Sequence, residues 1–287
     1  MDSKTKGRLR LWLRSEKAMG LGSVIAPRGV AVEAEPQDLP EPPSMAVDRP
    51  ARSKSVSAPV IAAQATVAST ALFGADVHQP FTTPVLARAE KVRLLEAMNA
   101  AEVSVCTKCR LCETRTHTVF GEGDVDAQIF FIGEGPGENE DLSGRPFVGR
   151  AGQKLTEMIA SMGLQREHVF IANIVKCRPP SNREPAPDET ATCTPYLVRQ
   201  LEIIRPKVIV TLGRPSSQYM LQSKLSMTRL RGQWQDWRGI KLIPTFHPAY
   251  LLRNYTQETR LAVWSDLKQV MAELGIPLPK KSAKSGA

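Results

Sequence analysis

Short hydrophobic segments alternate with longer amphipathic ones between residues 127 and 274. Four segments have the length and the β-branched and aromatic content of buried strands: AQIFFIG, HVFIANIVKC, KVIVTLG and IKLIPTF. Others have the character of helices, among them AGQKLTEMIASMG, DETATCTPYLVRQLEIIRP, PSSQYMLQ and ETRLAVWSDLKQVMAEL. This alternation predicts an α/β fold with a central four-stranded parallel sheet flanked by helices on both faces, in three α/β/α layers.

Three polar segments rich in glycine or proline follow these strands. They are GEGPGENED (133–141) after the first strand, KCRPPSNREP (176–185) after the second and HPAYLLRN (247–254) after the fourth. Right-handed crossovers place the carboxyl ends of parallel strands on one edge of the sheet, which is where open sheets bind ligands. We therefore expect the three segments to meet in one site.

The first of these segments does not match a nucleotide-binding loop. A dinucleotide fingerprint needs a small residue where Glu138 stands, and no GK[ST] motif follows. The carboxylates of Glu134, Glu138, Glu140 and Asp141 would repel a phosphate, but they could position a water molecule or polarise a sugar carbon. Taken alone, such a segment is more often an ordinary strand-to-helix turn with solvated acids.

An aromatic ring, an amide and a histidine near the strand ends have the chemistry of a nucleobase pocket. Phe147 in GRPFVGRAG (144–152) offers a stacking face, Asn173 a bidentate amide and His247 a hydrogen-bond donor. Each of these residue types is more often structural when it occurs alone. Their placement at successive strand ends favours base recognition.

Composition separates residues 1–90 from the rest of the chain. They hold nine of the 22 prolines and only three aromatic residues, and they show neither helical nor strand periodicity. Such a segment cannot bury enough apolar surface to offset its ordering entropy, so we predict a disordered extension. Its opening, KTKGRLRLWLRSEK, is more typical of a solvated basic tail than of a targeting signal, and no segment is long and apolar enough for a membrane span. The predicted domain covers residues 91–276, and a basic tail follows at 277–287.

The formal net charge is +9, and residues 1–90 contain 11 basic and 9 acidic residues, which leaves +7 for the remaining 197. A positive domain is compatible with a polyanionic partner.

Three of the five cysteines lie in CTKCRLC (106–112). Without a secretory signal, this clustering indicates a metal site or reactive thiols rather than disulfides. By spacing alone, it fits either a ferredoxin-type iron–sulfur run or half of a zinc site.

Taken together, the motifs GEGPGENED, GRPFVGRAG, IANIVKCRPPSNREP and FHPAYLLRN resemble those of the family 4 uracil-DNA glycosylases, the iron–sulfur branch of their superfamily. The resemblance implies a DNA repair enzyme that flips uracil out of single- or double-stranded DNA and hydrolyses its N-glycosidic bond, which leaves an abasic site. It further implies a monomer in the bacterial cytoplasm. It does not cover residues 1–90, which could bind a partner, add DNA affinity or serve as a tether.

The resemblance also implies roles for single residues in the base pocket. Phe147 stacks on the flipped uracil, Asn173 hydrogen-bonds its Watson–Crick edge and His247 donates to O2. Glu134 and Gly135 lie beside the sugar and the attacking water, and an aspartate replaces Gly135 in some other branches of the superfamily. We expect Glu134 to orient the water, with Glu140 as the second candidate.

Further residues are expected to contact DNA or a cofactor. Leu251 aligns with a wedge that fills the gap left by the extruded base, and four basic residues are expected on the phosphate backbone: Lys176, Arg178, Arg183 and Arg253. The resemblance implies a [4Fe–4S] cluster on four cysteines: Cys106, Cys109, Cys177 and Cys193. Cys112 falls where the family tolerates other residues.

Rival functions stay open at this level. One is a related glycosylase for other deaminated bases, and another is a non-catalytic iron–sulfur or zinc protein that binds DNA. An electron-transfer protein would not explain the base-pocket motifs. A branch that traps its product covalently has a histidine-containing insertion after the second strand, whereas CRPPSNREPAPDE has no histidine here.

Overall fold

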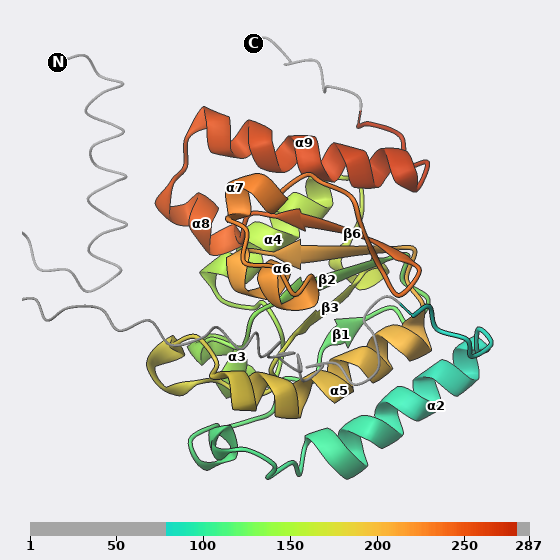
Figure 1. The fold of residues 1–287 in the computed structure, drawn as a ribbon, viewed down its shortest axis with the longest axis vertical. Helices are drawn as coiled ribbons and strands as arrows, with labels where there is room; N and C mark the ends of the chain where they lie inside the picture. The colour runs from blue at the N-terminus through green and yellow to red at the C-terminus, as the bar shows by residue number, and fades with distance from the viewer. Residues whose placement is uncertain (1–78, 280–287) are drawn as a thin grey trace, which may run out of the picture. The chain divides into compact units, whose positions relative to one another are not determined.

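A six-stranded mixed sheet forms the centre of the computed structural model, which describes residues 79–279 (Figure 1). The strand order is β1-β3-β2-β4-β6-β5. The four inner strands, β3, β2, β4 and β6, are parallel, and they correspond to the four predicted segments. The strand bounds are Glu122–Gly123 for β1, Ile129–Gly133 for β2, Phe170–Asn173 for β3, Val208–Leu212 for β4, Gln235–Trp237 for β5 and Ile240–Thr245 for β6.

The two edge strands are absent from the sequence prediction, which had four strands. They run antiparallel to their neighbours, β1 beside β3 and β5 beside β6. Both are too short and polar to show a strand pattern. The β5–β6 pair closes through Arg238 and Gly239, whose φ angles of 52° and 78° are the positive values that a tight two-residue hairpin requires.

Helices cover both faces of the sheet, as predicted (Figure 1). The side chains of β2 alternate between two cores: Phe131 faces the layer with α4, α8 and α9, and Phe130 faces the layer with α2, α5 and α6. The helix bounds are Arg88–Met98 for α2, Glu138–Ser143 for α3, Arg150–Ser161 for α4, Pro187–Ile204 for α5, Arg214–Met220 for α6, Met227–Leu230 for α7, Pro248–Arg253 for α8 and Gln257–Glu273 for α9. Short turns complete the chain at Asn99–Val103 (a π-helix), and at Arg110–Glu113, Arg166–His168 and Pro180–Asn182 (3₁₀-helices).

The packed domain begins earlier than residue 91. The predicted boundary falls inside α2, and residues before this helix already pack against the domain. The Phe81 ring meets the Trp237 ring edge-on at 6.0 Å between centroids, and the Arg205 guanidinium donates to the Thr83 carbonyl at 2.8 Å. The expectation of disorder is therefore wrong for residues 79–90. Its remainder, residues 1–78, and most of the predicted tail, 280–287, lie outside the described residues.

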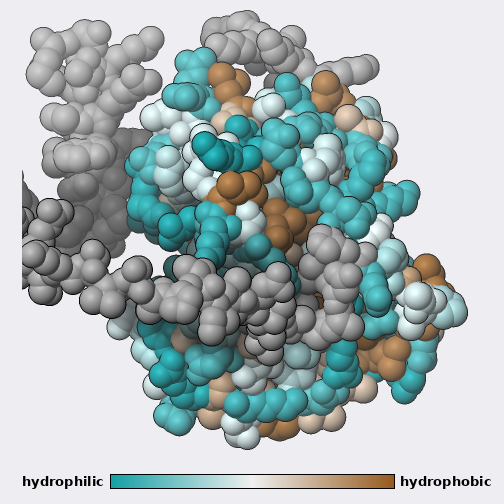
Figure 2. Space-filling view, viewed as in Figure 1, coloured by the Kyte–Doolittle hydropathy of each residue, from teal (hydrophilic) through white to brown (hydrophobic). Residues whose placement is uncertain are grey.

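The face of the described residues seen in Figure 2 is mainly polar, and hydrophobic residues form small separate groups on it. Within residues 79–279, no helix is both long and apolar enough to cross a membrane. Several large hydrophobic side chains on the α8–α9 segment are nevertheless exposed: Tyr250, Leu252, Tyr255 and Leu261.

Candidate active site at the carboxyl edge of the sheet

Five residues predicted to surround a base line one pocket: Glu134, Gly135, Phe147, Asn173 and His247. They come from the ends of β2, β3 and β6 and from the turn before α4. Parallel pairing aligns two of these ends directly, since Gly133 is the register partner of Asn173. The structure thus brings together segments that are more than a hundred residues apart in sequence.

The Asn173 side chain presents an unused acceptor to this pocket. Asn173 is 1% exposed, and its Oδ1 has no hydrogen-bond partner among the described residues. A buried polar atom without a partner is costly, so the arrangement suits a ligand that brings a donor. Gly133 makes the arrangement possible, because an added Cβ would lie 2.3 Å from Asn173 Oδ1 and 2.6 Å from Phe147 Cζ.

Phe147 is held in an unusual backbone conformation. Its φ of 51° lies in the left-handed region, where a bulky residue is rare and strained. Gly152 permits this turn, since a Cβ there would lie 1.8 Å from the Phe147 carbonyl oxygen. The ring is buried, with its centroid 5.7 Å from that of His247. It forms a fixed flat wall beside the histidine.

Glu140 holds the turn that carries Phe147. Its Oε1 accepts from the backbone N–H groups of Val148 and Gly149, both at 2.8 Å, and its Oε2 accepts from that of Gly137 at 3.2 Å. Three donors from two segments therefore engage this carboxylate. The contacts do not agree with its expected second-choice role in orienting water. They indicate that Glu140 joins the start of α3 to the Phe147 turn.

His247 is neutral, and its tautomer is fixed. Burial, and secondarily the charge of Arg253, lower the pKa of the His247 imidazole to about 4. Its Nδ1 accepts from the Ala249 backbone N–H at 3.1 Å, at the start of α8. Because Nδ1 is the acceptor, the single proton of the neutral ring is on Nε2. Gly213 leaves room for the side chain, since a Cβ there would lie 2.8 Å from His247 Cβ.

Glu134 is half-buried at the end of β2. Burial, followed by the charge of Glu184, raises the pKa of the Glu134 carboxyl to about 7, while Arg214 opposes the rise. The neighbouring Gly135 has little room for a side chain, because its Cβ would lie 2.8 Å from Val175 Cγ2. An aspartate at position 135 would therefore require Val175 to move.

Several residues at the pocket mouth were not identified from the sequence. Glu184 and Arg214 line it, as do Phe246 and Tyr250, whose rings stack at 4.8 Å between centroids. The sequence signal that could have identified them is their position close to the predicted strand ends. Arg253, which was predicted, also lines the mouth and is exposed.

Two of the other predicted DNA contacts are engaged within the protein. Arg183 lines the mouth, but its two terminal nitrogens donate to the buried Glu189 at 2.8 and 2.6 Å. Arg178 donates to Asn182 Oδ1 at 2.8 Å and lies 3.7 Å from a Glu138 carboxylate oxygen.

Two predicted DNA contacts are wrong for this conformation, because their side chains are buried. Leu251 is 4% exposed and packs in the core beneath α8, whereas its neighbour Leu252 is 36% exposed. Lys176 is 1% exposed, and its ammonium donates to the Asn173 carbonyl at 2.9 Å and to Gln200 Oε1 at 2.7 Å. Lys176 therefore supports the strand end that carries Asn173 and does not face DNA.

Four of the five cysteines line a second, small cavity: Cys106, Cys109, Cys177 and Cys193. The first two belong to the segment before the Arg110–Glu113 turn, the third follows β3, and the fourth lies on α5. Cys112, which the structure also describes, does not line this cavity. The four cysteines that line the cavity are the four predicted as ligands, and Cys112 is the predicted bystander.

Positive and polar groups surround these thiols. The Arg115 guanidinium donates to Cys177 Sγ at 3.2 Å, and the Lys176 backbone N–H donates to Cys193 Sγ at 3.2 Å. Burial raises the pKa of the Cys193 thiol to about 12, so an uncompensated thiolate is unfavourable there. No group of three or more Cys, His, Asp or Glu side chains in residues 79–279 is arranged to hold a single metal ion. Four thiol side chains are the donor set that structural zinc and iron–sulfur clusters both use.

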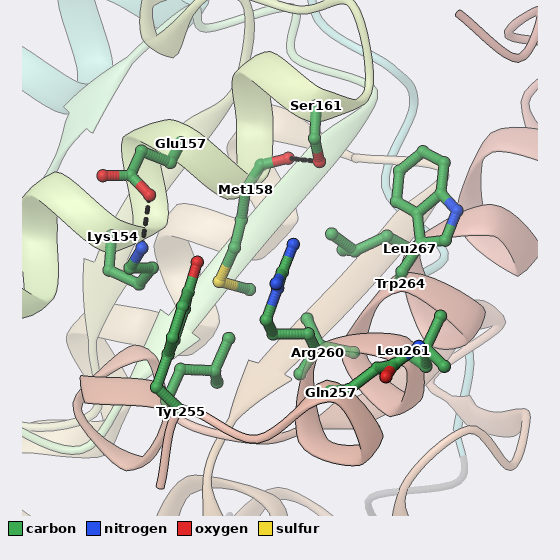
Figure 3. Close-up of a pocket in the computed structure, with 12 residues that line it drawn as sticks. Lys154, Glu157, Met158, Ser161, Tyr255, Gln257, Arg260, Leu261, Trp264 and Leu267 are labelled. Carbon is green, nitrogen blue, oxygen red and sulfur yellow. Dashed lines mark hydrogen bonds and ion pairs between the residues drawn. The ribbon is translucent and has the colours of Figure 1, made fainter. Parts of the chain in front are cut away.

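A third concavity, the groove between α4 and α9, has different chemistry. Its floor is apolar, and Figure 3 shows Met158 pointing into it. Along one side, Lys154 pairs with Glu157, and the Tyr255 ring has Lys154 and Arg260 each 5.1 Å from its centroid. The polar groups at its margin are thus largely paired with one another, in contrast to the unpaired Asn173 Oδ1 of the base pocket.

Comparisons with known proteins identify the family of this chain. Residues 120–268 match a family model described as the uracil DNA glycosylase superfamily. The chain is 52% identical over 169 residues to the type-4 uracil-DNA glycosylase of Thermotoga maritima, which covers 58% of this chain and 88% of that protein. It is 50% identical over 190 residues to the type-4 enzyme of Sulfurisphaera tokodaii, covering 63% and 84%. Identity to the type-5 uracil-DNA glycosylase of Pyrobaculum aerophilum is lower, 27% over 170 residues, covering 53% and 75%.

Proposed function

The chain belongs to the uracil DNA glycosylase superfamily, and we propose that it removes uracil from DNA by hydrolysing the N-glycosidic bond, as its type-4 relatives are named for doing. It is a DNA repair hydrolase that leaves an abasic site. The base pocket lies at the carboxyl edge of the sheet, where the base must be flipped out of the DNA to reach it.

The unpaired Asn173 Oδ1 is the observation that carries this proposal. Uracil has a donor at N3 and an acceptor at O4, so one amide can accept from the first and donate to the second. Cytosine has the opposite pattern, with an acceptor at N3 and a donor at C4. With the Asn173 amide kept in this orientation, cytosine would place an acceptor against the buried Oδ1 and leave it unpaired, which costs roughly 1–3 kcal/mol. Asn173 would thus select uracil.

Phe147 and His247 would act on the leaving base. The buried Phe147 ring supports stacking, since its backbone turn and the Glu140 contacts fix its orientation. The neutral His247 carries its proton on Nε2, and we assign this group to uracil O2, where negative charge develops as the glycosidic bond breaks. A neutral donor stabilises this charge without first transferring a proton to the base.

Glu134 would act on the sugar side. Bond breaking leaves a cationic sugar, and an ionised carboxylate beside it can stabilise this charge and orient water for attack. Glu134 lines the pocket, and its carboxylate, unlike that of Glu140, is not engaged by backbone N–H groups in the described contacts. We therefore assign the water to Glu134 and a positioning role to Glu140.

The four clustered cysteines would hold a [4Fe–4S] cluster: Cys106, Cys109, Cys177 and Cys193. When bound, the cluster would take no part in base removal. It would hold these segments together. Cys177 lies four residues after Asn173. Lys176 links Asn173 to the cysteine site, because its ammonium donates to the Asn173 carbonyl and its backbone N–H donates to Cys193 Sγ. The cysteine site would thus fix the strand end that reads the base.

DNA contact is proposed for the rim of the pocket. Arg253 is exposed at the mouth, and Arg178 and Arg183 lie nearby in the segment after β3. We assign the wedge to Leu252 in place of Leu251, since Leu252 is the exposed member of the pair. Single- and double-stranded uracil-containing DNA are both proposed substrates, and a monomer in the bacterial cytoplasm remains our proposal for assembly and compartment.

A uracil-excision assay tests the proposal. The purified protein should release uracil from an end-labelled oligonucleotide, and strand cleavage should appear only after alkali treatment. His247→Ala should lose roughly 10²-fold or more in single-turnover rate because it removes one donor to the developing anion. Glu96→Gln, on the exposed surface of α2, serves as the control. Absence of alkali-labile product with the wild-type protein, iron bound, would refute the proposal.

A further inference from the structure

Glu134 lies at the junction of two cavities. One is the base pocket, and the other lies beside it, between α6 and the start of α5, where Ile174, Gln218 and Tyr219 line it. Four residues line both cavities: Glu134, Glu184, Pro185 and Pro215. The Glu134 carboxylate is therefore accessible to charges from both sides.

Two charged side chains reach this junction from separate elements. Glu184 belongs to the segment between β3 and α5, and Arg214 is the first residue of α6. Their closest charged atoms, Arg214 Nη2 and Glu184 Oε2, are 3.9 Å apart. The loop of Glu134 approaches this segment closely, because a Cβ on Gly135 would lie 3.9 Å from Pro185 Cγ.

We infer that Glu184 and Arg214 form a charge pair that adjusts the proton occupancy of the buried Glu134 in opposite directions, which makes both of them positioning residues for the hydrolysis step. The inference rests on the proposed function of Glu134. Neither side chain needs to touch the substrate for this role. Glu184 favours the protonated carboxyl by like-charge repulsion, and Arg214 favours the carboxylate.

The electrostatics of the junction agree with this geometry. After burial, the charge of Glu184 is the next cause that raises the pKa of Glu134, and Arg214 is the group that opposes the rise. Other charged or titratable groups that line the two cavities are Glu140, Arg183, Tyr219, Lys224, His247, Tyr250 and Arg253. Glu140 is engaged by backbone N–H groups, Arg183 by Glu189, and His247 is neutral. Lys224 and Arg253 are exposed, and neither contributes to the pKa shift of Glu134, which leaves Glu184 and Arg214 as the charged groups that act on this carboxyl.

The two residues should move the pH dependence of excision in opposite directions. Only ionised Glu134 can orient the water, so the rate should fall as the pH drops through the pKa of this carboxyl. Removing the negative charge of Glu184 makes ionisation easier and moves this acid limb to lower pH. Removing the positive charge of Arg214 has the reverse effect and moves the limb to higher pH.

The experiment is a pH profile of kcat/KM on a uracil-containing oligonucleotide with the full-length holoenzyme, since kcat/KM reports groups of the free enzyme. Glu184→Gln should shift the acid limb down, and Arg214→Met should shift it up, each by a few tenths of a pH unit, because the side chains of Arg214 and Glu184 are 62% and 63% exposed and solvent screens their charges. Glu134→Gln should remove the limb. Glu96→Gln makes the same chemical change as Glu184→Gln on the exposed surface of α2, and it should leave the limb in place. The position of the limb is diagnostic because lost DNA affinity would lower the whole profile without moving it.

A second readout does not depend on activity. The ¹³C shift of the Glu134 carboxyl, assigned by its absence in Glu134→Gln, can be followed against pH in the full chain. The same opposite displacements are expected in Glu184→Gln and Arg214→Met. Equal titration in all three proteins, or displacement in one common direction, would overturn the inference. Wild-type protein without excision at any pH would instead refute the proposed function, and the carboxyl titration would still test the charge pair.

Discussion

Gly133 is the residue on which the shape of the base pocket depends most directly. It ends β2 in register with Asn173, and the Asn173 amide and the Phe147 ring both occupy the space where a side chain would project. Contacts this close leave no room for even a methyl group, so the requirement for glycine here is steric.

Gly133→Ala should therefore abolish uracil excision while the protein stays folded. The added methyl would displace the Asn173 amide or the Phe147 ring, and we expect a loss of at least about 10²-fold in single-turnover rate, since small misplacements in a site cost this much. Gly163→Ala is the matched control, because it introduces strain at a φ of 77° but meets no atom within 4 Å. The control should lose some thermal stability and keep its rate. Equal rates in both variants would contradict this account of the pocket.

The sequence located the pocket residues better than it located their neighbours. Phe147, Asn173 and His247 were identified because the order of strands and helices places strand ends on one edge. The positioning role of Glu140 was not foreseen, since its carboxylate accepts from backbone N–H groups eight and nine residues away. Glu184 and Arg214 were missed because no local pattern shows that two loops share a junction. Burial and partners of this kind are set by packing between distant segments.

Helix α8 shows the same distinction at the level of an element. Ala249, Tyr250 and Arg253 of this helix line the base pocket, while Leu251 on another face enters the core beneath it. Adjacent positions on a helix are about 100° apart, so Leu251 and Leu252 cannot share an environment. A motif that reads Leu-Leu does not reveal which leucine is exposed.

The two leucines should consequently respond differently to truncation. Leu251→Ala opens a cavity in the core and should lower the free energy of unfolding by about 2–5 kcal/mol. Leu252→Ala should leave stability nearly unchanged but lower excision from duplex DNA more than from single strands, because only a duplex has a gap to fill. Thermal denaturation and paired kinetics on the two substrates test this. A stable Leu251→Ala protein with a selective duplex defect would restore the original assignment.

The cysteine site joins three elements that the chain keeps apart. Cys106 and Cys109 precede the sheet, Cys177 follows β3, and Cys193 lies on α5. The sequence spacing alone suggested that Cys106, Cys109 and Cys112 act together. The cavity instead includes the two distal thiols and leaves Cys112 out.

Cys193→Ser should therefore lose iron and visible absorbance, and Cys112→Ser should keep both. The serine at position 193 removes one of four proposed thiolate ligands from a buried site, whereas Cys112 is partly exposed beside it. Iron and zinc analysis with absorption spectra distinguishes a cluster from a zinc site. Loss of iron from Cys112→Ser with retention in Cys193→Ser would reverse the ligand assignment.

At the scale of the whole molecule, the three-layer core could be predicted, but its borders could not. The inner strands have strong hydrophobic patterns, whereas the edge strands are two and three residues long and polar. The same reasoning failed at the amino-terminal border. Phe81 and Thr83 lie in a proline-rich segment of low aromatic content, and only their contacts with distant residues show that they belong to the domain.

Two amino-terminal truncations should separate the border of the domain from the extension before it. Removal of residues 1–78 should leave the melting temperature nearly unchanged, because it spares all the contacts described here. Removal of residues 1–90 also deletes the start of α2 and the Phe81 ring, which packs on Trp237 and lies 4.6 Å from the Arg205 guanidinium. Phe81 is only partly buried, so its loss should cost less than the roughly 3–5 kcal/mol of a fully buried aromatic, about 1–3 kcal/mol or roughly 2–12 °C in a domain of this size. Calorimetry on both proteins tests this, and equal melting temperatures would mean that residues 79–90 add nothing to the fold.

A salt series tests whether residues 1–78 contact DNA. Excision by the full-length protein and by the protein that lacks residues 1–78 should be compared across it, since only lost phosphate contacts reduce the salt slope.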